Sequence, residues 1–382
     1  KGSERLEPMS ARDAQDASPS AELTTIAAAP DAGAAGAAAV DASTLVDQGG
    51  WRRPRTTPSL SEVYSSVPVP HDARFWRKVA AFMGPGLMVA VGAVVGSGPV
   101  LRTLGKGLLV SGGLDAMGGL AVLSAAGCGL ALGNRLRVPQ STSQVTVFAV
   151  LGTGIAGAGC RWEAMVPLLL AWVVLPLAAF LCTFVAARII GSPPPGAELA
   201  APAAARWRAL AIATGAYVAF AIGTNNVPNA VAPLGAVFPG SPALAFCLAA
   251  GVLFGLGGYA YGEPLMRKSG RQLAAFGPRA AAAIAITTAS LLLIASSFGF
   301  PQSLVQLNVL ATLGVGCAKY GIRTTMRKGV LRGILLVWLA APLLGGGLAW
   351  AIRRLSTDTT LAYLLPVFCA TALVWNAWPR GA

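Results

Sequence analysis

The sequence predicts an all-α polytopic membrane protein with two homologous repeats. Three observations indicate this class: an apolar composition, a succession of apolar runs after the first 75 residues, and motifs of the first half that recur in the second. Of the 382 residues, 55% are hydrophobic and 12% are charged, whereas about a quarter of the residues in a soluble protein are charged. An ordinary soluble domain is therefore excluded.

The charged residues support the membrane interpretation. Residues 76–382 hold 22 Lys and Arg against five Asp and Glu. Basic clusters such as Arg267, Lys268 and Arg271 lie in short gaps between apolar runs, where cationic side chains commonly flank membrane helices. This placement disfavours nucleic-acid binding. It is compatible with an anionic substrate.

The chain divides into a tail and two membrane repeats. Residues 1–75 are rich in Ala, Ser, Pro and Asp without apolar periodicity, which predicts a disordered N-terminal tail. A first transmembrane repeat is expected over 76–190 and a second over 207–352. Between them, 191–206 contains three consecutive prolines and is predicted as a linker. Residues 353–382 are predicted to form a C-terminal transmembrane segment.

Ten apolar runs predict about 8–10 membrane segments. They lie near 79–100, 108–132, 143–159, 164–190, 207–237, 242–261, 278–299, 303–318, 331–352 and 361–378. Several reach the roughly 20 residues that a helix needs to span a bilayer. The runs that begin at 143 and 303 are shorter and rich in glycine, so broken or re-entrant helices are expected there.

A polar box occurs twice, as PQSTSQ from Pro139 and as PQSLVQ from Pro301. Residues 138–156 and 300–318, which contain the boxes, are identical at ten of 19 positions. Upstream, GPVLRTLGKGLL pairs with EPLMRKSGRQLA, and downstream WVVLPL pairs with WLAAPL, at nearly the same shift. Three matches in the same order indicate a duplicated membrane unit.

Duplicated membrane halves with interrupted helices are typical of secondary transporters, whose sites form near the bilayer midplane. A proline disrupts the helix, and freed backbone groups are tolerated at membrane depth only inside protein or along a water-filled cavity. Hydroxyl groups beside helix N-terminal amides suit an anion. The alternative interpretation of each box is a membrane-surface turn with an N-cap serine, and spacing alone does not separate the two.

A second polar island, GTNNVPNAVAPLGAV, contains Asn225, Asn226 and Asn229. Three amides within five residues are costly in hydrocarbon unless they find partners. The island therefore predicts either a binding site or a tight interhelical network with nothing bound.

This island, from Gly223 to Val237, resembles the GANDVANA signature of the inorganic phosphate transporter (PiT) family, whose members are cation-coupled phosphate permeases with sulfate permeases among their relatives. The boxes are similar to that family's PxSTTH motifs, and VLRTLGKGLL is similar to its TIGKGI-like segment. The resemblance covers roughly residues 80–352. It implies a multi-pass transporter of two inverted repeats that moves inorganic phosphate by symport with sodium or protons, without enzymatic activity or a further cofactor.

The resemblance also implies site residues at matching positions. An anion would contact the two boxes and the signature, and amide oxygens of the signature would be candidate sodium ligands. The predicted substrate-binding residues are Ser141, Thr142, Ser143, Gln144, Asn225, Asn226, Asn229, Ser303 and Gln306. The predicted sodium ligands are Asn225, Asn226 and Asn229.

The chain departs from the family pattern at the site. Asn226 stands where the family has aspartate, Gln144 and Gln306 replace histidines, and Leu304 and Val305 replace threonines. The carboxylate that would best neutralise a cation is thereby absent. Shifting the signature back by the repeat length lands near 46–74, which does not resemble a membrane helix, so the first repeat is expected to be incomplete.

Two classes of function remain open from the sequence. The first is a permease, with phosphate as the leading substrate and sulfate or another oxyanion as the alternative. The second is a membrane scaffold or sensor that no longer transports. The absent carboxylate slightly favours a fully ionised anion, because hydrogen phosphate donates a hydrogen bond and rewards an acceptor. Expected partners are the anion, the lipid bilayer and further copies of the chain, but no nucleic acid.

Overall fold

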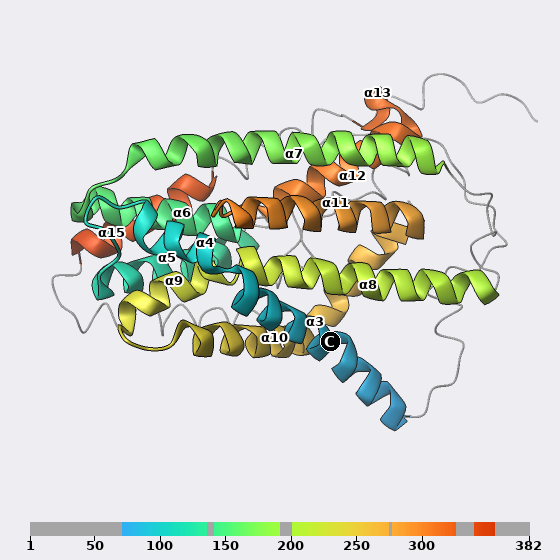
Figure 1. The fold of residues 1–382 in the computed structure, drawn as a ribbon, viewed down its shortest axis with the longest axis horizontal. Coiled ribbons are helices and arrows are strands. Elements are labelled where there is room, and N and C mark those ends of the chain that lie inside the picture. The colour runs from blue at the N-terminus through green and yellow to red at the C-terminus, as the bar shows by residue number, and fades with distance from the viewer. Residues whose placement is uncertain (1–70, 136–140, 192–200, 275–276, 326–339, 356–382) are drawn as a thin grey trace, which may run out of the picture.

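A computed structural model describes residues 71–135, 141–191, 201–274, 277–325 and 340–355. Within these ranges the chain is helical (Figure 1), and the extended contact is one isolated antiparallel bridge between Leu109 and Cys160. The predicted all-α polytopic class is confirmed.

The helices follow one another in two sets. The first set is α3 (His71–Gly96), α4 (Gly98–Arg102), the π-helical turn η2 (Thr103–Gly107), α5 (Ala116–Arg135), α6 (Thr142–Thr153), the π-helical turn η3 (Gly154–Ala158) and α7 (Trp162–Ile190). The second set is α8 (Ala201–Asn225), α9 (Pro228–Val237), α10 (Ala243–Ala274), α11 (Pro278–Ser297), α12 (Leu304–Tyr320), α13 (Ile322–Thr325), the π-helical turn η4 (Pro342–Gly347) and α15 (Leu348–Leu355).

Two helix starts differ from the predicted boundaries. Helix α3 begins at His71, inside the predicted tail, and α8 begins at Ala201, inside the predicted linker. The rest of the tail and the run at 361–378 lie outside the described residues. So do residues 46–70 of the segment 46–74, where the sequence predicts that the first signature helix is missing.

The apolar run predicted at 108–132 is divided by a connecting segment. Gly112 adopts φ +80°, a left-handed conformation that glycine tolerates best. A side-chain oxygen of Asp115 then accepts the Gly118 N–H at 2.9 Å, which is the contact an N-cap residue makes at a helix start. Helix α5 therefore begins at Ala116 instead of continuing the run from 108.

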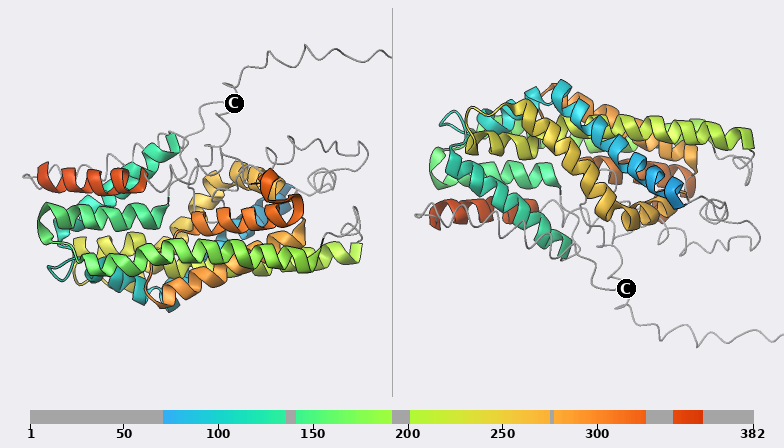
Figure 2. Two further views of the ribbon diagram at one scale, coloured as in Figure 1. Left: turned by 90° about the horizontal axis from the view of Figure 1, so that it is seen from above. Right: turned by 90° about the horizontal axis from the view of Figure 1, so that it is seen from below.

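Two helical hairpins, one from each repeat, are the most visible sign of the duplicated architecture. Helices α5 and α6 form one hairpin and α11 and α12 the other, and the two occupy opposite ends of the molecule, with α7 running alongside both (Figures 1 and 2). In each hairpin the serine of the polar box, Ser141 or Ser303, is the N-cap of the second helix. The structure thus matches the predicted pair of inverted repeats with re-entrant helices.

The helices pack closely where glycines remove the side chain. A Cβ added at Gly92 of α3 would overlap the carbonyl oxygen of Phe220, and one added at Gly223 of α8 would overlap that of Val89. The two backbones therefore touch at this crossing, as small residues permit in membrane helices. The crossing lies immediately before the end of α8 at Asn225.

The outer surface is apolar, as a lipid-facing surface must be. Helix α7, the stretch Ala209–Val237 and α11 are each long and apolar enough to cross a bilayer. The pair Phe82–Gly96 and Gly98–Gly107 passes the same test together across a bend of 67°. Large apolar side chains exposed along α7 include Val166, Leu169, Leu170, Val173, Val174, Leu177, Leu181 and Val185. The chain is therefore a multi-pass integral membrane protein.

Candidate functional site

The candidate site lies where the break between α8 and α9 meets the two polar boxes. Pro228 has no N–H, so the helical hydrogen bond that would reach back four residues cannot form, and α8 ends at Asn225. The break is short, because the Asn226 N–H still bonds to the Ile222 carbonyl at 2.7 Å. It presents the asparagines of the signature to both boxes.

Asn225 holds the second box. Its side-chain amide donates to the Ser296 hydroxyl and to the Phe300 carbonyl, each at 2.9 Å, and its oxygen accepts the Gln302 N–H at 2.8 Å. The side chain is completely buried. Trp172 of α7 adds a fourth contact by donating to the Pro301 carbonyl at 2.8 Å. The backbone that leads into α12 is thus fixed by two other helices.

Asn226 and Asn229 contact the first box instead. The Asn229 amide donates to the Ser143 hydroxyl at 3.1 Å, and the Asn226 amide lies 3.4 Å from the Thr142 hydroxyl. One interrupted helix therefore joins the boxes of both hairpins. This contact pattern explains why three polar residues occur within five positions of an apolar segment.

The two boxes have the same local geometry. Ser141 has φ −92° and ψ 117°, and Ser303 has φ −77° and ψ 107°. Each hydroxyl accepts the N–H of the glutamine three residues later, at 3.3 Å for Gln144 and 3.2 Å for Gln306. Both serines are therefore N-caps, at the starts of α6 and α12. A surface turn is ruled out as the interpretation of these boxes, because both serines are about 1% exposed.

Several buried amide atoms at the site have no hydrogen-bond partner among the described residues. The orphaned oxygens belong to Gln144, Asn226, Asn229, Gln302 and Gln306, and the orphaned nitrogens belong to Gln302 and Gln306. A buried polar atom without a partner costs about 1–3 kcal/mol. Buried groups in native proteins almost always find partners, so this cluster indicates a place for a bound polar species.

All nine predicted site residues lie in the two boxes or in the signature that hydrogen-bonds to both boxes, but their side chains make different contacts. Thr142 and Ser143 face the signature, whereas the Asn225 side chain is fully engaged in holding the second box. Asn226 and Asn229 are the two predicted sodium ligands whose oxygens are without a partner. Neutral amide oxygens fit a hard monovalent cation in type, though without a compensating charge.

Two participants were not predicted. Gln302 belongs to the repeated motif and is not among the predicted site residues, yet it is completely buried, and neither of its side-chain amide atoms has a partner among the described residues. Ser296, near the end of α11, accepts from Asn225 and lies 2.9 Å from the Thr224 hydroxyl. The recurrence of glutamine directly after proline in both boxes was the one sequence signal that pointed to Gln302.

Known transporters resemble this chain over most of its length. The chain is 29% identical over 287 residues to the sulfate permease CysP of Bacillus subtilis, covering 73% of this chain and 78% of that protein. A solved structure described as a sodium-dependent phosphate transporter superposes with a TM-score of 0.60 at 21% identity, covering 72% of this chain and 89% of that one. This second likeness confirms the fold.

A shorter similarity concerns another kind of transporter. Over 44 residues the chain is 57% identical to the divalent metal cation transporter MntH of Listeria monocytogenes, covering 12% of this chain and 10% of MntH. The similarity thus involves a small part of each protein.

The family comparison covers most of the molecule. The model of the phosphate transporter family matches residues 67–193 and 197–349. These ranges include both hairpins, the interrupted helix α8–α9 and every residue of the candidate site. The chain therefore belongs to the phosphate transporter family, a family of transporters and not of enzymes, which is the family that its motifs resemble.

Proposed function

We propose that this chain carries an inorganic oxyanion, phosphate or sulfate, across the membrane by symport with sodium or protons. The proposal rests on the buried, unpartnered amide atoms at the starts of α6 and α12 and on the signature asparagines that hydrogen-bond to both boxes. Helix N-termini favour anions through their free N–H groups and the helix dipole. The residues at the starts of α6 and α12 are both hydrogen-bonded to asparagines of the α8–α9 segment, and two such termini beside neutral amide donors suit a tetrahedral oxyanion.

The same site supports a weak cation site. The unpartnered oxygens of Asn226 and Asn229 would hold sodium on the side of the first box. The residues that hydrogen-bond across the site are all uncharged, so the bound anion would supply the negative charge next to the cation. Cation and anion would then bind together, which is the requirement for symport.

The relatives support both oxyanions. The family description and the solved structure support phosphate, and CysP, which is similar over 73% of the chain, supports sulfate. Both substrates are tetrahedral and differ in whether they retain a proton near neutral pH. The homo-oligomer predicted from the sequence remains a prediction.

The test is uptake by proteoliposomes that contain the purified chain. Radiolabelled phosphate and sulfate would each be offered with a sodium gradient, with a proton gradient and with neither. The variant Gln306→Leu removes a buried amide at the site, and Asn308→Leu is the matched control, since Asn308 is a partly exposed residue of the same helix.

We expect uptake of at least one anion, dependence on one gradient, and at least about a tenfold loss in Gln306→Leu, because a hydrogen bond to a charged group contributes about 1.5–3 kcal/mol. The Asn308 control should retain uptake. Folded protein that takes up neither anion under any gradient would instead support the scaffold or sensor interpretation.

A further inference from the structure

Gln302 and Gln306 are the two described residues of the site whose buried side chains have no partner for either amide atom, and Gln302 is the more deeply buried of the two. It precedes the N-cap Ser303, its side chain is 0% exposed, and neither its amide nitrogen nor its amide oxygen has a partner among the described residues. If the Gln302 side chain bound nothing, its two buried polar atoms would each cost about 1–3 kcal/mol. Its chemistry is therefore that of a residue with a ligand to bind.

The backbone around Gln302 is fixed before any ligand arrives. Asn225 bonds to both Phe300 and Gln302, and Trp172 bonds to Pro301 between them. Three consecutive residues are thus tied to α7 and α8, which come from different parts of the chain. Such preorganisation places a side chain accurately and lowers the entropy lost on binding.

The second box lacks two hydroxyl groups that the first box has. In the first box, Thr142 and Ser143 provide hydroxyl groups after the N-cap. In the second box Leu304 and Val305 occupy the corresponding positions. The unpartnered donors that remain at this end of the site are the side-chain nitrogens of Gln302 and Gln306.

Resting on the proposed function, we propose that Gln302 is a specificity-determining ligand whose neutral amide donates to the transported oxyanion and admits an anion without a proton. An amide N–H donates equally well to sulfate and to phosphate. A carboxylate in its place would repel sulfate, which has no proton to offer, but could accept a hydrogen bond from the P–OH group of hydrogen phosphate. The neutral side chain therefore keeps the site open to the fully ionised anion.

The decisive experiment compares sulfate and phosphate uptake by proteoliposomes of the wild type, Gln302→Glu, Gln302→Leu and the control Asn308→Asp. We expect Gln302→Glu to lower the ratio of sulfate to phosphate uptake by at least about tenfold, equivalent to about 1.4 kcal/mol. Gln302→Leu should lower uptake of both anions at least about tenfold. The control should leave the ratio within about twofold of the wild type.

Folding is checked by circular dichroism, size-exclusion chromatography and thermal unfolding of each variant. If Gln302→Glu does not fold, Gln302→Leu decides the matter alone, since it tests the ligand without adding a charge. An unchanged ratio in folded Gln302→Glu, or wild-type uptake by folded Gln302→Leu, would overturn the assignment while the proposed function stands. A folded wild type that transports neither anion would overturn both.

Discussion

At the scale of single residues, the three asparagines of the signature divide into a positioning residue and two site residues. The sequence predicted the same role for all of them. In the structure Asn225 donates to Ser296 of α11 and to the Phe300 carbonyl, and its oxygen accepts the Gln302 N–H. Asn226 makes one longer contact with Thr142 and keeps an unpartnered oxygen. Truncating each residue should therefore have different consequences.

We expect Asn225→Ala to destabilise the protein by about 2–6 kcal/mol, because it removes the partner of two buried backbone groups, the Phe300 carbonyl and the Gln302 N–H, at about 1–3 kcal/mol each. Asn226→Ala should cost less than about 1 kcal/mol of stability but should abolish most of the uptake. Thermal unfolding in detergent, measured beside transport, separates the two effects. Equal loss of stability in both variants would contradict this division of roles.

A second prediction at the residue scale concerns Asn226 and the sodium site proposed above. Asn226→Asp restores the carboxylate of the family signature at an oxygen that now lacks a partner. An opposite charge about 4 Å from a cation contributes about 4 kcal/mol at an effective dielectric constant of 20. We expect the sodium concentration for half-maximal uptake to fall at least about tenfold, as measured with labelled phosphate. A matched Asn308→Asp change should not alter it, and an unchanged sodium response in Asn226→Asp would remove this residue from the cation site.

At the scale of helices, close crossings position the site. Gly223 lies two residues before Asn225, and its backbone touches Val89 of α3. Gly223→Ala should force α3 and α8 apart and so displace Asn225 from the second box. Gly215→Ala on the same helix is the control, since a Cβ there meets no atom within 4 Å, and alanine favours a helix by up to about 1 kcal/mol over glycine.

We expect a lower melting temperature and reduced uptake for Gly223→Ala, with an unchanged or higher melting temperature for Gly215→Ala. The comparison can be made by thermal unfolding of purified protein in one detergent. If both substitutions had the same effect, the crossing would not be the element that aligns the site.

Much of the helix arrangement could be predicted from the sequence, because helix starts and breaks depend on local residue patterns. The boxes, their helix starts and the polar break all follow from proline, serine and apolar periodicity. Contacts between distant segments could not be predicted in this way. That Asn225 reaches Gln302 while Asn229 reaches Ser143 depends on how α8 and α9 face the two hairpins, and one sequence contains no signal for that orientation. For the same reason the sequence does not predict that Gln302 lies at the site.

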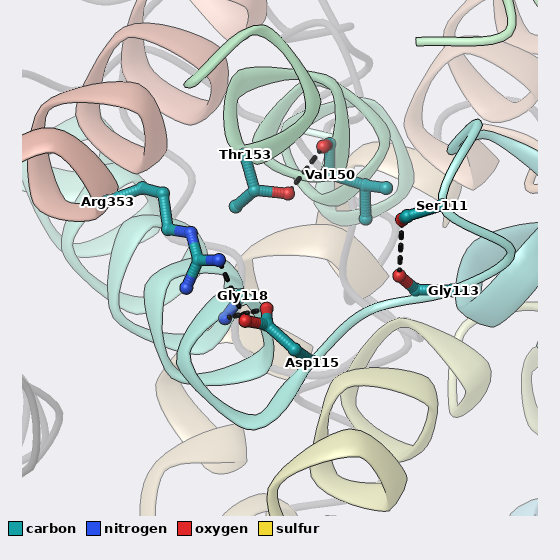
Figure 3. Close-up of polar contacts among 7 residues, drawn as sticks. All are labelled: Ser111, Gly113, Asp115, Gly118, Val150, Thr153 and Arg353. Carbon is teal, nitrogen blue, oxygen red and sulfur yellow. Dashed lines mark hydrogen bonds and ion pairs between the residues drawn. The ribbon is translucent and has the colours of Figure 1, made fainter. Parts of the chain in front are cut away.

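At the scale of the whole molecule, the α5–α6 and α11–α12 hairpins lie at opposite ends. A different side-chain contact is found at each of these ends. At the end of the first hairpin, Arg353 of α15 donates to Asp115 at 2.7 Å, across 238 positions of sequence (Figure 3). At the end of the second, the Arg279 guanidinium lies 5.3 Å from the centre of the Trp207 ring. The ion pair at the first end joins segments that lie far apart in the sequence, and salt should weaken it.

The ion pair should contribute little to stability yet respond to salt. The Arg353 and Asp115 side chains are 25% and 60% exposed, and such exposed pairs typically contribute about 0.2–1 kcal/mol because solvent screens them. Asp115→Asn keeps an oxygen that can accept the Gly118 N–H, so this variant removes the negative charge without removing the helix cap.

A double-mutant cycle of Asp115→Asn and Arg353→Gln, followed by thermal unfolding, should give a coupling energy of about 0.5 kcal/mol at low salt. That coupling should shrink at 1 M salt, where the Debye length is about 3 Å. A coupling above about 2 kcal/mol that persists in salt would mean that this contact is shielded from solvent in the membrane and that opening this end of the molecule requires breaking it.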